Sequence, residues 1–600
     1  MTTRRSFIKT LAVVPPALYF RPAWSAPDPS RLALIIGNSS YRDAPLVNPA
    51  NDAKAVGALF TRAGFTVDSR LDTTRIDMMA AIERFGAAVK RSETKLVVFY
   101  YAGHGAQLDW HNYLLPVDAV VQKQDDLKQR CVDLSLLLGQ FGATKDKTFV
   151  VILDACRNNP FGSAYRPEQK GLSQFDAPVG SLLAYATAPG NVASDGEGQN
   201  GLYTENLVRE LGQRNTRIED ALKRVRLNVR LASKGEQIPW ETTSLEGDVF
   251  IFNEGQKKLS ETELEQLVEA DVTEWARIKS SKKIDDWVSY LRSFPNGRFA
   301  EIAQMRLARL LAEDEKLAAE KRQREEQQRL EQERLAAERK QQEEQRQTAE
   351  KRRSEQAAAV QSAAVQKAPT ASPAPGPATD QSPRPVAAAP SGKPMLDIRA
   401  GGSVPTLIAP SANPFSAGRY PLGRIFTVGD TATMRQTDIL TGVEERTYHP
   451  RVTRVDFDED RVEFNNGNTI TDLMGNPIKN GEVEFDSPVQ FIPAEFQIGK
   501  KWTAAFRRTQ SDKTTNAYYD LHIVKRETIS VPAGSFDTFL IEGNGWNTTV
   551  NSKLDARFWL VPGVNFAIRR EFVVRNQRGG FRQTERHELV ALRQRVIGSS

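Results

Sequence analysis

Two short apolar segments, each followed by a turn with a reactive side chain, constrain the fold of this chain more than any other feature. The first is KLVVFYYAGHG, which contains His104, and the second is FVVILDACRNNP, which contains Cys156. Short runs of Val, Ile, Phe and Tyr bounded by glycine or polar residues are typical of strands that a parallel sheet buries on both faces. Side chains that follow such strands gather at the carboxyl edge of the sheet, where ligands bind. The pattern predicts an α/β fold with both side chains at one sheet edge.

A cysteine and a histidine at the same sheet edge are suited to nucleophilic catalysis. The thiolate is the attacking species, and a neighbouring imidazole can take the thiol proton. Gly103 and Gly105 flank His104 and allow a sharp turn and a close approach to a substrate. Backbone N–H groups at Gly105 and Cys156 are then candidate donors to an oxyanion. We predict that Cys156 is the nucleophile and that His104 is its base.

The alternative interpretation of these two residues is structural, because a lone cysteine in an apolar run is often an inert core residue. Cys131 illustrates that case: it enters a predicted leucine-rich helix, KQRCVDLSLLL, with no glycine turn and no nearby histidine. Whether Cys156 and His104 meet in space depends on the fold. Four further histidines lack the setting of a strand followed by glycine: His111, His449, His522 and His587.

Three motifs in chain order, LALIIGNSSY, AGHG and DAC, resemble the caspase and metacaspase superfamily of cysteine peptidases. The similarity continues into SLLAYATAPGNVASDGEGQNGLYTENLVREL, which resembles the small-subunit part of the caspase unit, and it covers residues 30–253. The resemblance implies a mostly parallel sheet flanked by helices, with His104 and Cys156 as the catalytic dyad. Neither position is substituted, so the resemblance implies an active cysteine endopeptidase.

The same resemblance bears on specificity. Caspases use an arginine in a VSWR motif to hold a substrate aspartate, and the matching stretch here, VASD, puts Asp195 at that position. Metacaspases select basic side chains with acidic pocket residues, and two of those positions match Asp52 and Asp154. Carboxylates favour a guanidinium or ammonium group through charge-assisted hydrogen bonds. The resemblance therefore implies a peptide or protein substrate that is cleaved after Arg or Lys.

Each of the three carboxylates also has a structural interpretation. Asp52 follows asparagine where a helix begins, as a helix N-cap does. Asp154 ends a predicted strand, where a carboxylate can bond loop amides. Asp195 precedes glycine, as in an ordinary turn.

The loop after Cys156, FGSAYRPEQKGLSQFDAPVG, is polar and carries Arg166 and Lys170. In relatives such a loop is where the chain is cut or rearranged to open the pocket. We predict that Arg166 or Lys170 is an autoprocessing site, and the alternative is an ordinary exposed loop.

No cofactor is expected to be required, although calcium remains an alternative. Metacaspases often depend on calcium through clustered aspartates, and Asp125 and Asp126 are the candidates here. Adjacent aspartates at a helix start are more typical of capping charges, since a calcium site needs about six or more oxygen ligands. Zinc is not expected, because the cysteines and histidines form no closely spaced ligand pairs.

The first 25 residues resemble a twin-arginine export signal, with Arg4 and Arg5 before a short apolar stretch. That stretch is too short and too rich in proline to span a bilayer, so we expect a removable signal and no transmembrane segment in the mature chain. Export of the folded protein would place it in the periplasm or outside the cell. In that oxidising setting we predict that Cys131 and Cys156 both remain free, because a disulfide between them would silence the nucleophile.

The charge balance gives no electrostatic case for a nucleic-acid partner. The chain carries a net charge of +6, and its predicted signal contributes positive charges without a carboxylate. Nucleic-acid binding relies on a marked excess of Lys and Arg.

Residues 260–312 are predicted to form amphipathic helices that resemble a single tetratricopeptide-like hairpin. Their apolar stripe either binds a peptide or packs on the neighbouring domain. Residues 313–365 are predicted to form a solvated helix. From Glu313 to Glu355 the sequence consists largely of Glu, Gln, Arg, Lys and Ala, and this stretch would span about 65 Å at about 1.5 Å per residue. A weak coiled coil is the alternative, because leucines are sparse there. Residues 366–395 read as a Pro/Ala linker.

Residues 396–600 change to short alternating runs separated by Asn-Gly and glycine-rich turns, which predict a β-rich domain with an antiparallel sheet. VPAGSFDTFLIEG and FWLVPGVNFAIRRE resemble envelope β-domains related to lipoprotein carriers, which implies a partner in the cell envelope. Trp502, Trp546 and Trp559 are expected in its core rather than on a ligand platform.

The predicted domains, in order, are 1–25, 30–253, 260–312, 313–365, 366–395 and 396–600. The leading functional hypothesis is a cysteine endopeptidase that also processes its own chain. The alternative is a non-enzymatic envelope adaptor that uses the caspase-like unit to bind basic peptides. A mainly structural spacer is a third hypothesis.

Overall fold

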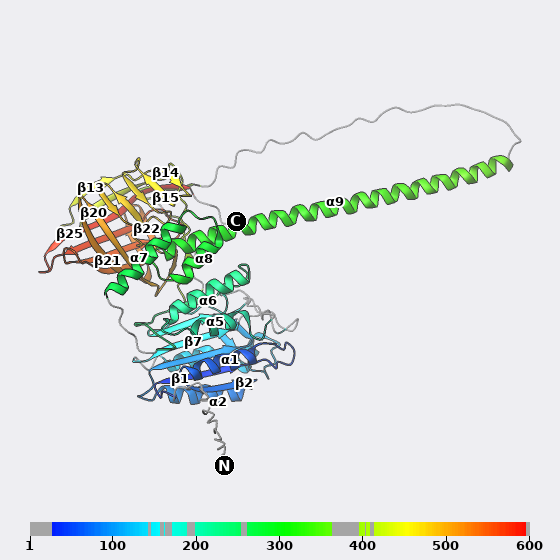
Figure 1. The fold of residues 1–600 in the computed structure, drawn as a ribbon, viewed down its shortest axis with the longest axis horizontal. Helices are drawn as coiled ribbons and strands as arrows, with labels where there is room; N and C mark the ends of the chain where they lie inside the picture. Colours follow the sequence, from blue (N-terminus) through cyan, green and yellow to red (C-terminus); the bar gives the residue numbers. More distant parts are fainter. Residues whose placement is uncertain are drawn as a thin grey trace, which may run out of the picture.

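The computed structural model shows an α/β unit, a helical part with one long projecting helix, and a β-rich part (Figure 1). The predicted fold class is confirmed. The structure describes residues 27–141, 146–155, 161, 171–188, 198–253, 261–362, 395–402, 404–408, 413 and 415–595.

The α/β unit is built on a six-stranded sheet with the order β2-β1-β3-β7-β8-β9. The first five strands are parallel, and β9 runs antiparallel to β8. Nearly every residue of β1, β3, β7 and β8 is buried, as expected for strands covered on both faces. The strands are β1 Arg31–Gly37, β2 Thr66–Leu71, β3 Leu96–Ala102, β7 Thr148–Asp154, β8 Ser181–Tyr185 and β9 Trp240–Thr243.

Helices cover both faces of this sheet because successive side chains of a strand point to opposite sides. Tyr100 of β3 lies in the cluster formed with α1, α5 and α6, whereas Tyr101 lies in the cluster formed with α2 and α4. A small sheet of β4, β5 and β6 extends beyond the carboxyl end of β3. The elements are α1 Pro49–Arg62, α2 Arg75–Val89, β4 Gly105–Leu108, β5 His111–Leu114, α3 Gln124–Arg130, β6 Val132–Asp133, α4 Leu134–Phe141, α5 Leu202–Leu211 and α6 Ile218–Ala232.

The helical part consists of α7 Glu261–Ile278, α8 Ile284–Ser293 and the start of α9. Its predicted apolar stripe is buried: Trp287 and Tyr290 are fully enclosed, and Trp275 stacks on Phe299 at 4.6 Å between ring centroids. Leu227 of α6 packs against the same cluster. The stripe is therefore used for packing within the helices and against the α/β unit.

Helix α9 spans Ala300–Ser362, which is 63 residues or about 95 Å at about 1.5 Å per residue. The charged helix expected from residue 313 thus begins earlier, and no boundary separates it from the helical part. The segment contains neither glycine nor proline, so nothing in the sequence ends the helix there. Beyond Glu313 its described side chains are mostly exposed. Among described residues, no helix is long and apolar enough to cross a membrane.

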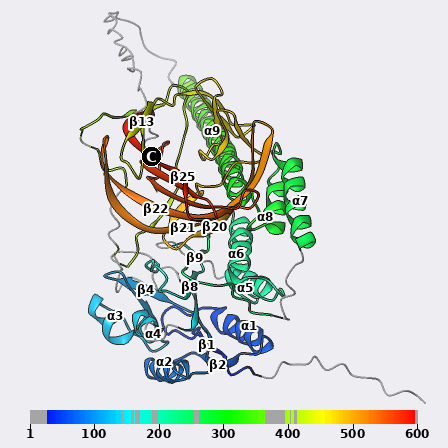
Figure 2. The ribbon, with the colours of Figure 1, turned by 90° about the vertical axis from the view of Figure 1, so that its left-hand side faces the viewer.

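The β-rich part is a large antiparallel sheet whose central strands bend strongly (Figure 2). The order is β13-β12-β25-β24-β23-β22-β21-β20-β18-β17-β16-β15-β14, with β10 on β25 and a separate pair, β11 and β19. The strands are β10 Met395–Ile398, β11 Arg419–Pro421, β12 Thr431–Asp438, β13 Glu444–Tyr448, β14 Val452–Asp456, β15 Arg461–Phe464, β16 Thr469–Thr471, β17 Pro477–Asn480, β18 Val483–Phe485, β19 Glu495–Gln497, β20 Lys501–Gln510, β21 Lys513–Val531, β22 Gly534–Asn547, β23 Ser552–Leu560, β24 Arg569–Arg575 and β25 Phe581–Arg595.

The three tryptophans of the β-rich part differ in burial. Trp559 belongs to its hydrophobic core, and Trp502 packs against that core while its indole N–H donates to the Gln490 carbonyl at 2.6 Å. Trp546 is 40% exposed, so the expectation of a core position is wrong for this residue. Ile302 of α9 also lies in this core, which attaches the helix to the sheet.

Candidate active site

Strands β3 and β7 bring the two sequence motifs to the same edge of the parallel sheet. The strands are adjacent and parallel, with Ala102 opposite Asp154. Beyond them, the Gly103 N–H donates to the Asp154 carbonyl at 3.3 Å. His104 comes two positions after the end of β3. Cys156 comes two positions after the end of β7 in the sequence, and it lies outside the described residues.

Gly105 packs directly beside the segment that leads to Cys156. A Cβ atom added to Gly105 would lie 3.3 Å from the Ala155 Cβ and 2.8 Å from a methyl carbon of Leu172. A larger residue would therefore push these neighbours apart. Of the two predicted oxyanion donors, the structure places Gly105 next to Ala155, the residue before Cys156.

The His104 side chain is buried and oriented by a main-chain carbonyl. Its imidazole is 4% exposed, lies 4.5 Å from the Tyr41 ring between centroids, and places Nε2 2.8 Å from the Ala44 carbonyl oxygen. A carbonyl oxygen only accepts hydrogen bonds, so Nε2 is the donor in this contact. The neutral ring then carries its basic lone pair on Nδ1, which is the nitrogen suited to accept a proton.

Two tyrosines that the sequence analysis did not single out hold the main chain of His104. The His104 N–H donates to the Tyr41 hydroxyl at 2.9 Å, and the Tyr101 hydroxyl donates to the His104 carbonyl at 2.7 Å. Burial raises the pKa of both phenols well above the usual value, so they stay neutral. A buried tyrosine hydroxyl needs a polar partner. The tyrosines in the run FYYAGHG could therefore have indicated a hydrogen bond to the main chain near His104.

Asp52 is fully buried in α1 and contacts the beginning of α5. One carboxylate oxygen accepts the Asn200 side-chain amide and the Gly201 N–H, each at 2.9 Å. Gly201 is the N-cap of α5, so the carboxylate lies at the positive end of that helix dipole. The N-cap interpretation of Asp52 is wrong, because Asn48 occupies the N-cap of α1.

Asp154 is 2% exposed and lies in the same polar region as Asp52. It accepts a hydrogen bond from the Thr204 hydroxyl at 2.8 Å, and that hydroxyl lies 2.6 Å from the Tyr100 hydroxyl. The pKa of Tyr100 is raised by burial, then by the negative charges of Asp154 and Asp52. The two carboxylates therefore act on one buried tyrosine, on the sheet face opposite Tyr101. Asp195, Arg166 and Lys170 lie outside the described residues.

Comparison with known proteins agrees with this geometry. Residues 30–250 match the model of the caspase domain family.

This part of the chain is a caspase domain.

Two animal proteins show how limited the similarity to curated relatives is. The human mucosa-associated lymphoid tissue lymphoma translocation protein 1 is 28% identical over 161 residues, which cover 27% of this chain and 19% of that protein. Caspase-1 of Mus musculus is 22% identical over 237 residues, which cover 35% of this chain and 56% of that protein. The chain thus spans little more than half the length, or less, of the curated relatives it matches. The caspase domain has the fold of a cysteine peptidase.

The second cysteine of the caspase domain has the environment of an unreactive thiol. Cys131 follows α3, is 2% exposed and is a free cysteine. Burial raises the pKa of its thiol to about 12, so the thiolate is scarce at neutral pH. The structural interpretation of Cys131 is confirmed.

The aspartates considered for calcium are engaged at the start of α3. The Asp126 carboxylate accepts the main-chain N–H groups of Gln122 at 2.9 Å and Lys123 at 3.1 Å, as in a capping box. Asp125 lies in the same first helical turn. Within the described ranges, no cluster of three or more His, Cys, Asp or Glu side chains could hold a metal ion.

The β-rich part contacts the caspase domain through residues 413 and 415–418, here termed the docking segment. The Ser416 hydroxyl donates to the Asp176 carboxylate at 2.8 Å. The Phe415 ring stacks on Phe175 at 5.1 Å between centroids and meets His111 edge to face at the same distance. Phe175 and Asp176 belong to the stretch that carries Leu172, the residue that packs on Gly105. No motif in the sequence indicated this contact.

Proposed function

We propose that the caspase domain is a cysteine endopeptidase in which Cys156 attacks the scissile carbonyl and His104 is the general base. The observation that carries this proposal is the register of β3 and β7, which brings Gly105, the residue after His104, beside Ala155, the residue before Cys156. The Nε2 contact of His104 with the Ala44 carbonyl supports it, since that contact directs the basic lone pair to Nδ1.

In the first half of the proposed reaction, the Cys156 thiol gives its proton to Nδ1 of His104, and the thiolate sulfur bonds to the scissile carbonyl carbon. Main-chain N–H groups at Gly105 and Cys156 stabilise the negative oxygen. Collapse of this intermediate breaks the C–N bond, and the imidazolium returns its proton to the leaving amine. Water, deprotonated by His104, then hydrolyses the thioester and restores the thiol.

We infer that the substrate carries Arg or Lys before the scissile bond, with Asp52, Asp154 and Asp195 in the pocket. Support comes from two buried carboxylates that lie near one tyrosine. The same carboxylates also anchor the start of α5, so their substitution tests both roles.

The decisive experiment compares hydrolysis of fluorogenic peptides ending in Arg, Lys or Asp by the full chain, with and without calcium. Cys156→Ala should lower turnover by a factor of about 10³ or more, because no other nucleophile replaces the thiolate. Cys131→Ala is the matched control and should keep full activity. Cleavage only after Asp would contradict the pocket while sparing the dyad. Absence of Cys156-dependent turnover would favour the adaptor hypothesis.

Autoprocessing at Arg166 or Lys170 belongs to the same proposal. A chain with both residues replaced by Gln should remain one band during incubation, whereas the parent chain is cut. If the parent chain stays intact while it hydrolyses Arg peptides, the loop is an ordinary one.

Export by the twin-arginine route to the periplasm or beyond is also proposed, on the sequence of residues 1–25 alone. Replacing Arg4 and Arg5 by Lys should retain the protein in the cytoplasm of a bacterial host, as measured by fractionation. Unchanged export would contradict the proposal.

A further inference from the structure

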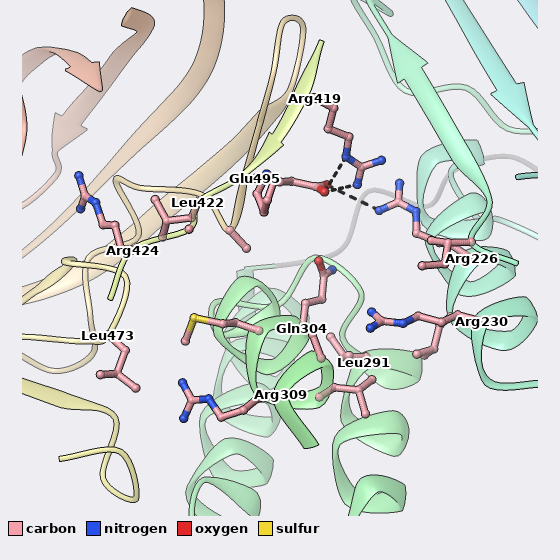
Figure 3. Close-up of a pocket in the computed structure, with 18 of the residues that line it drawn as sticks. Arg226, Arg230, Leu291, Gln304, Arg309, Arg419, Leu422, Arg424, Leu473 and Glu495 are labelled. Carbon is pink, nitrogen blue, oxygen red and sulfur yellow. Dashed lines mark hydrogen bonds and ion pairs between the residues drawn. The ribbon is translucent and has the colours of Figure 1, made fainter. Parts of the chain in front are cut away.

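A cavity of about 650 Å³ lies where the caspase domain, the helical part and the β-rich part meet (Figure 3). Its walls come from α6, α8, the first turns of α9, β11 and nearby loops of the β-rich part. This volume is in the range of small-molecule sites, about 300–1,000 Å³. Among the described candidate active-site residues, none lines it.

Positive charge dominates the polar part of the cavity wall. Glu495 is the one carboxylate among the described lining residues, and it already pairs with two arginines: its carboxylate lies 2.6 Å from Nε of Arg419 and 3.7 Å from Arg226. The lining cations are Lys223, Arg226, Arg230, Arg309, Arg419 and Arg424.

Arg230 is a lining cation whose charge no described carboxylate compensates. It follows Arg226 by one turn of α6, and both side chains extend toward Gln304 and Glu495 (Figure 3). In the part of the chain that the structure describes, Arg230 forms no ion pair, and its Nε has no hydrogen-bond partner. Burial and the charge of Arg226 lower the pKa of Arg230. A partly buried guanidinium without an anion is unfavourable, so an anionic ligand would stabilise this wall.

The remaining wall is apolar and lies on the other two parts of the molecule. Leu291 comes from α8, whereas Leu422 and Leu473 come from the β-rich part, and Figure 3 shows them around the same space as the arginines. Met305 and Phe426 extend this surface. The cavity therefore combines a basic side with a hydrocarbon side, which is the complement of an amphiphile with an acidic headgroup.

We propose that this cavity binds an anionic amphiphile, with a carboxylate or phosphate between Arg226 and Arg230 and a hydrocarbon chain against Leu291, Leu422 and Leu473. Guanidinium groups bind either headgroup through paired charge-assisted hydrogen bonds. The bound molecule touches all three parts of the chain, so it stabilises their docking by linkage. This site goes beyond the proposed peptidase activity and does not depend on it.

Calorimetric titration of the full chain tests the proposal, with sodium decanoate, decyl phosphate, 1-decanol, acetate and inorganic phosphate as probes below their aggregation limits. At least one of the two charged chains should bind saturably at one per protein, and the neutral and chainless probes should bind far more weakly. The preferred headgroup distinguishes a fatty acid from a phosphate-bearing lipid. Arg230→Gln should weaken binding by about tenfold or more, because a charge-assisted contact is lost.

Arg578→Gln, in the exposed turn between β24 and β25, is the matched control and should bind like the parent chain. Gln304→Trp is a second variant that fills the cavity, and it should abolish binding. Binding of decanol as tight as that of decanoate, or unchanged binding in both Arg230→Gln and Gln304→Trp, overturns the proposal. Absence of binding for both charged chains also overturns it.

Discussion

Asp154 ends β7 of the parallel sheet and is 2% exposed, whereas the side chain of Arg557 lies in the middle of β23 of the antiparallel sheet and is 57% exposed. Helices cover both faces of the first sheet, so its central strands, such as β3 and β7, carry polar groups mainly where they end. Strand β23 alternates between buried and exposed residues, so it carries charge along its length. The position of polar and charged side chains therefore follows from which faces of each sheet are covered.

Because of this difference, the same kind of substitution is expected to change stability or activity more at the strand ends of the caspase domain than on the open face of the antiparallel sheet. At the strand ends of the caspase domain, neighbours are fixed by packing and buried hydrogen bonds. On the open face of the antiparallel sheet, ion pairs such as Arg557 with Glu542 at 3.1 Å are screened by water.

Among the substitutions that compare the two sheets, the largest effect is expected for Gly105→Ala at the edge of the parallel sheet. The added methyl would meet Leu172 and Ala155, and the shift would displace a proposed oxyanion donor. We expect kcat/KM to fall by about 100-fold, or about 3 kcal/mol of transition-state stabilisation. Peptide hydrolysis by the purified variant measures this loss.

Gly139→Ala provides the matched control within the same domain. Gly139 lies in α4, and an added Cβ there meets no atom within 4 Å. Activity should be unchanged and stability slightly higher, because alanine favours a helix over glycine. Equal losses in both variants would show that Gly105 has no special position.

The next largest effect concerns Asp472, a fully buried carboxyl of the β-rich part. Burial, and then the charge of Asp460, raise its pKa to about 7. The folded state thus keeps a proton that the unfolded state releases near pH 4, so this group's stabilisation is present at low pH and is lost as pH rises toward 7.

Asp472→Asn should remove this pH-dependent contribution, on the order of 2 kcal/mol between pH 4 and pH 8. Thermal unfolding of the parent and the variant across that range measures it. An identical pH dependence in both proteins would show that Asp472 is ionised throughout. The result would sharpen the comparison, because Asp472 is one of the buried carboxyl groups of the β-rich part, unlike the exposed Arg557 on its open face.

Tyr101→Phe tests how strictly the fold holds His104. The hydroxyl that donates to the His104 carbonyl is lost, which should cost about 1 kcal/mol of stability and about five- to tenfold in kcat. A flatter pH profile of kcat would be expected only if His104 moves. A variant that loses stability but keeps kcat and its pH profile would assign Tyr101 to packing alone.

Phe415→Ala should loosen the docking segment with a smaller effect, about 0.5–1 kcal/mol, because its ring is 39% exposed and contacts two rings. Hydrogen exchange should become faster in residues 171–178. Unchanged exchange would show that hydrogen bonds such as Ser416 to Asp176 suffice.

The smallest effect is expected for Arg557→Gln on the open face of the antiparallel sheet. Loss of its exposed ion pair should change stability by less than about 0.5 kcal/mol. Chemical denaturation measures it, and a loss above about 1 kcal/mol would break the comparison between the two sheets.

The strands that carry His104 and Cys156 could be predicted because each is a short, continuous apolar run. The partners of Asp52 could not, since Asn200 and Gly201 lie about 150 residues further along the chain. Side-chain pairs at such separation are set by tertiary packing, which no local pattern encodes.

The distinction between local sequence patterns and tertiary contacts also explains the other differences between the predictions and the structure. Helix α9 begins at Ala300, before the predicted boundary at residue 313, because no glycine or proline separates the amphipathic segment from the charged one. The docking segment was missed because its contacts with Phe175 and Asp176 join parts of the chain about 240 residues apart. Tyr41 holds His104 from a turn that shows no periodicity.

The docking segment belongs to the same polypeptide as the surface it contacts. Its association is therefore intramolecular, with an effective concentration that reaches the millimolar range for short tethers. A few hydrogen bonds and one stacked ring, which would not hold two separate proteins together, are enough for such a contact. Other contacts join the same two parts, such as the Gln497 side-chain amide that donates to the Glu241 carbonyl at 3.1 Å, so the docking segment stays beside its partners and next to the stretch that packs on Gly105.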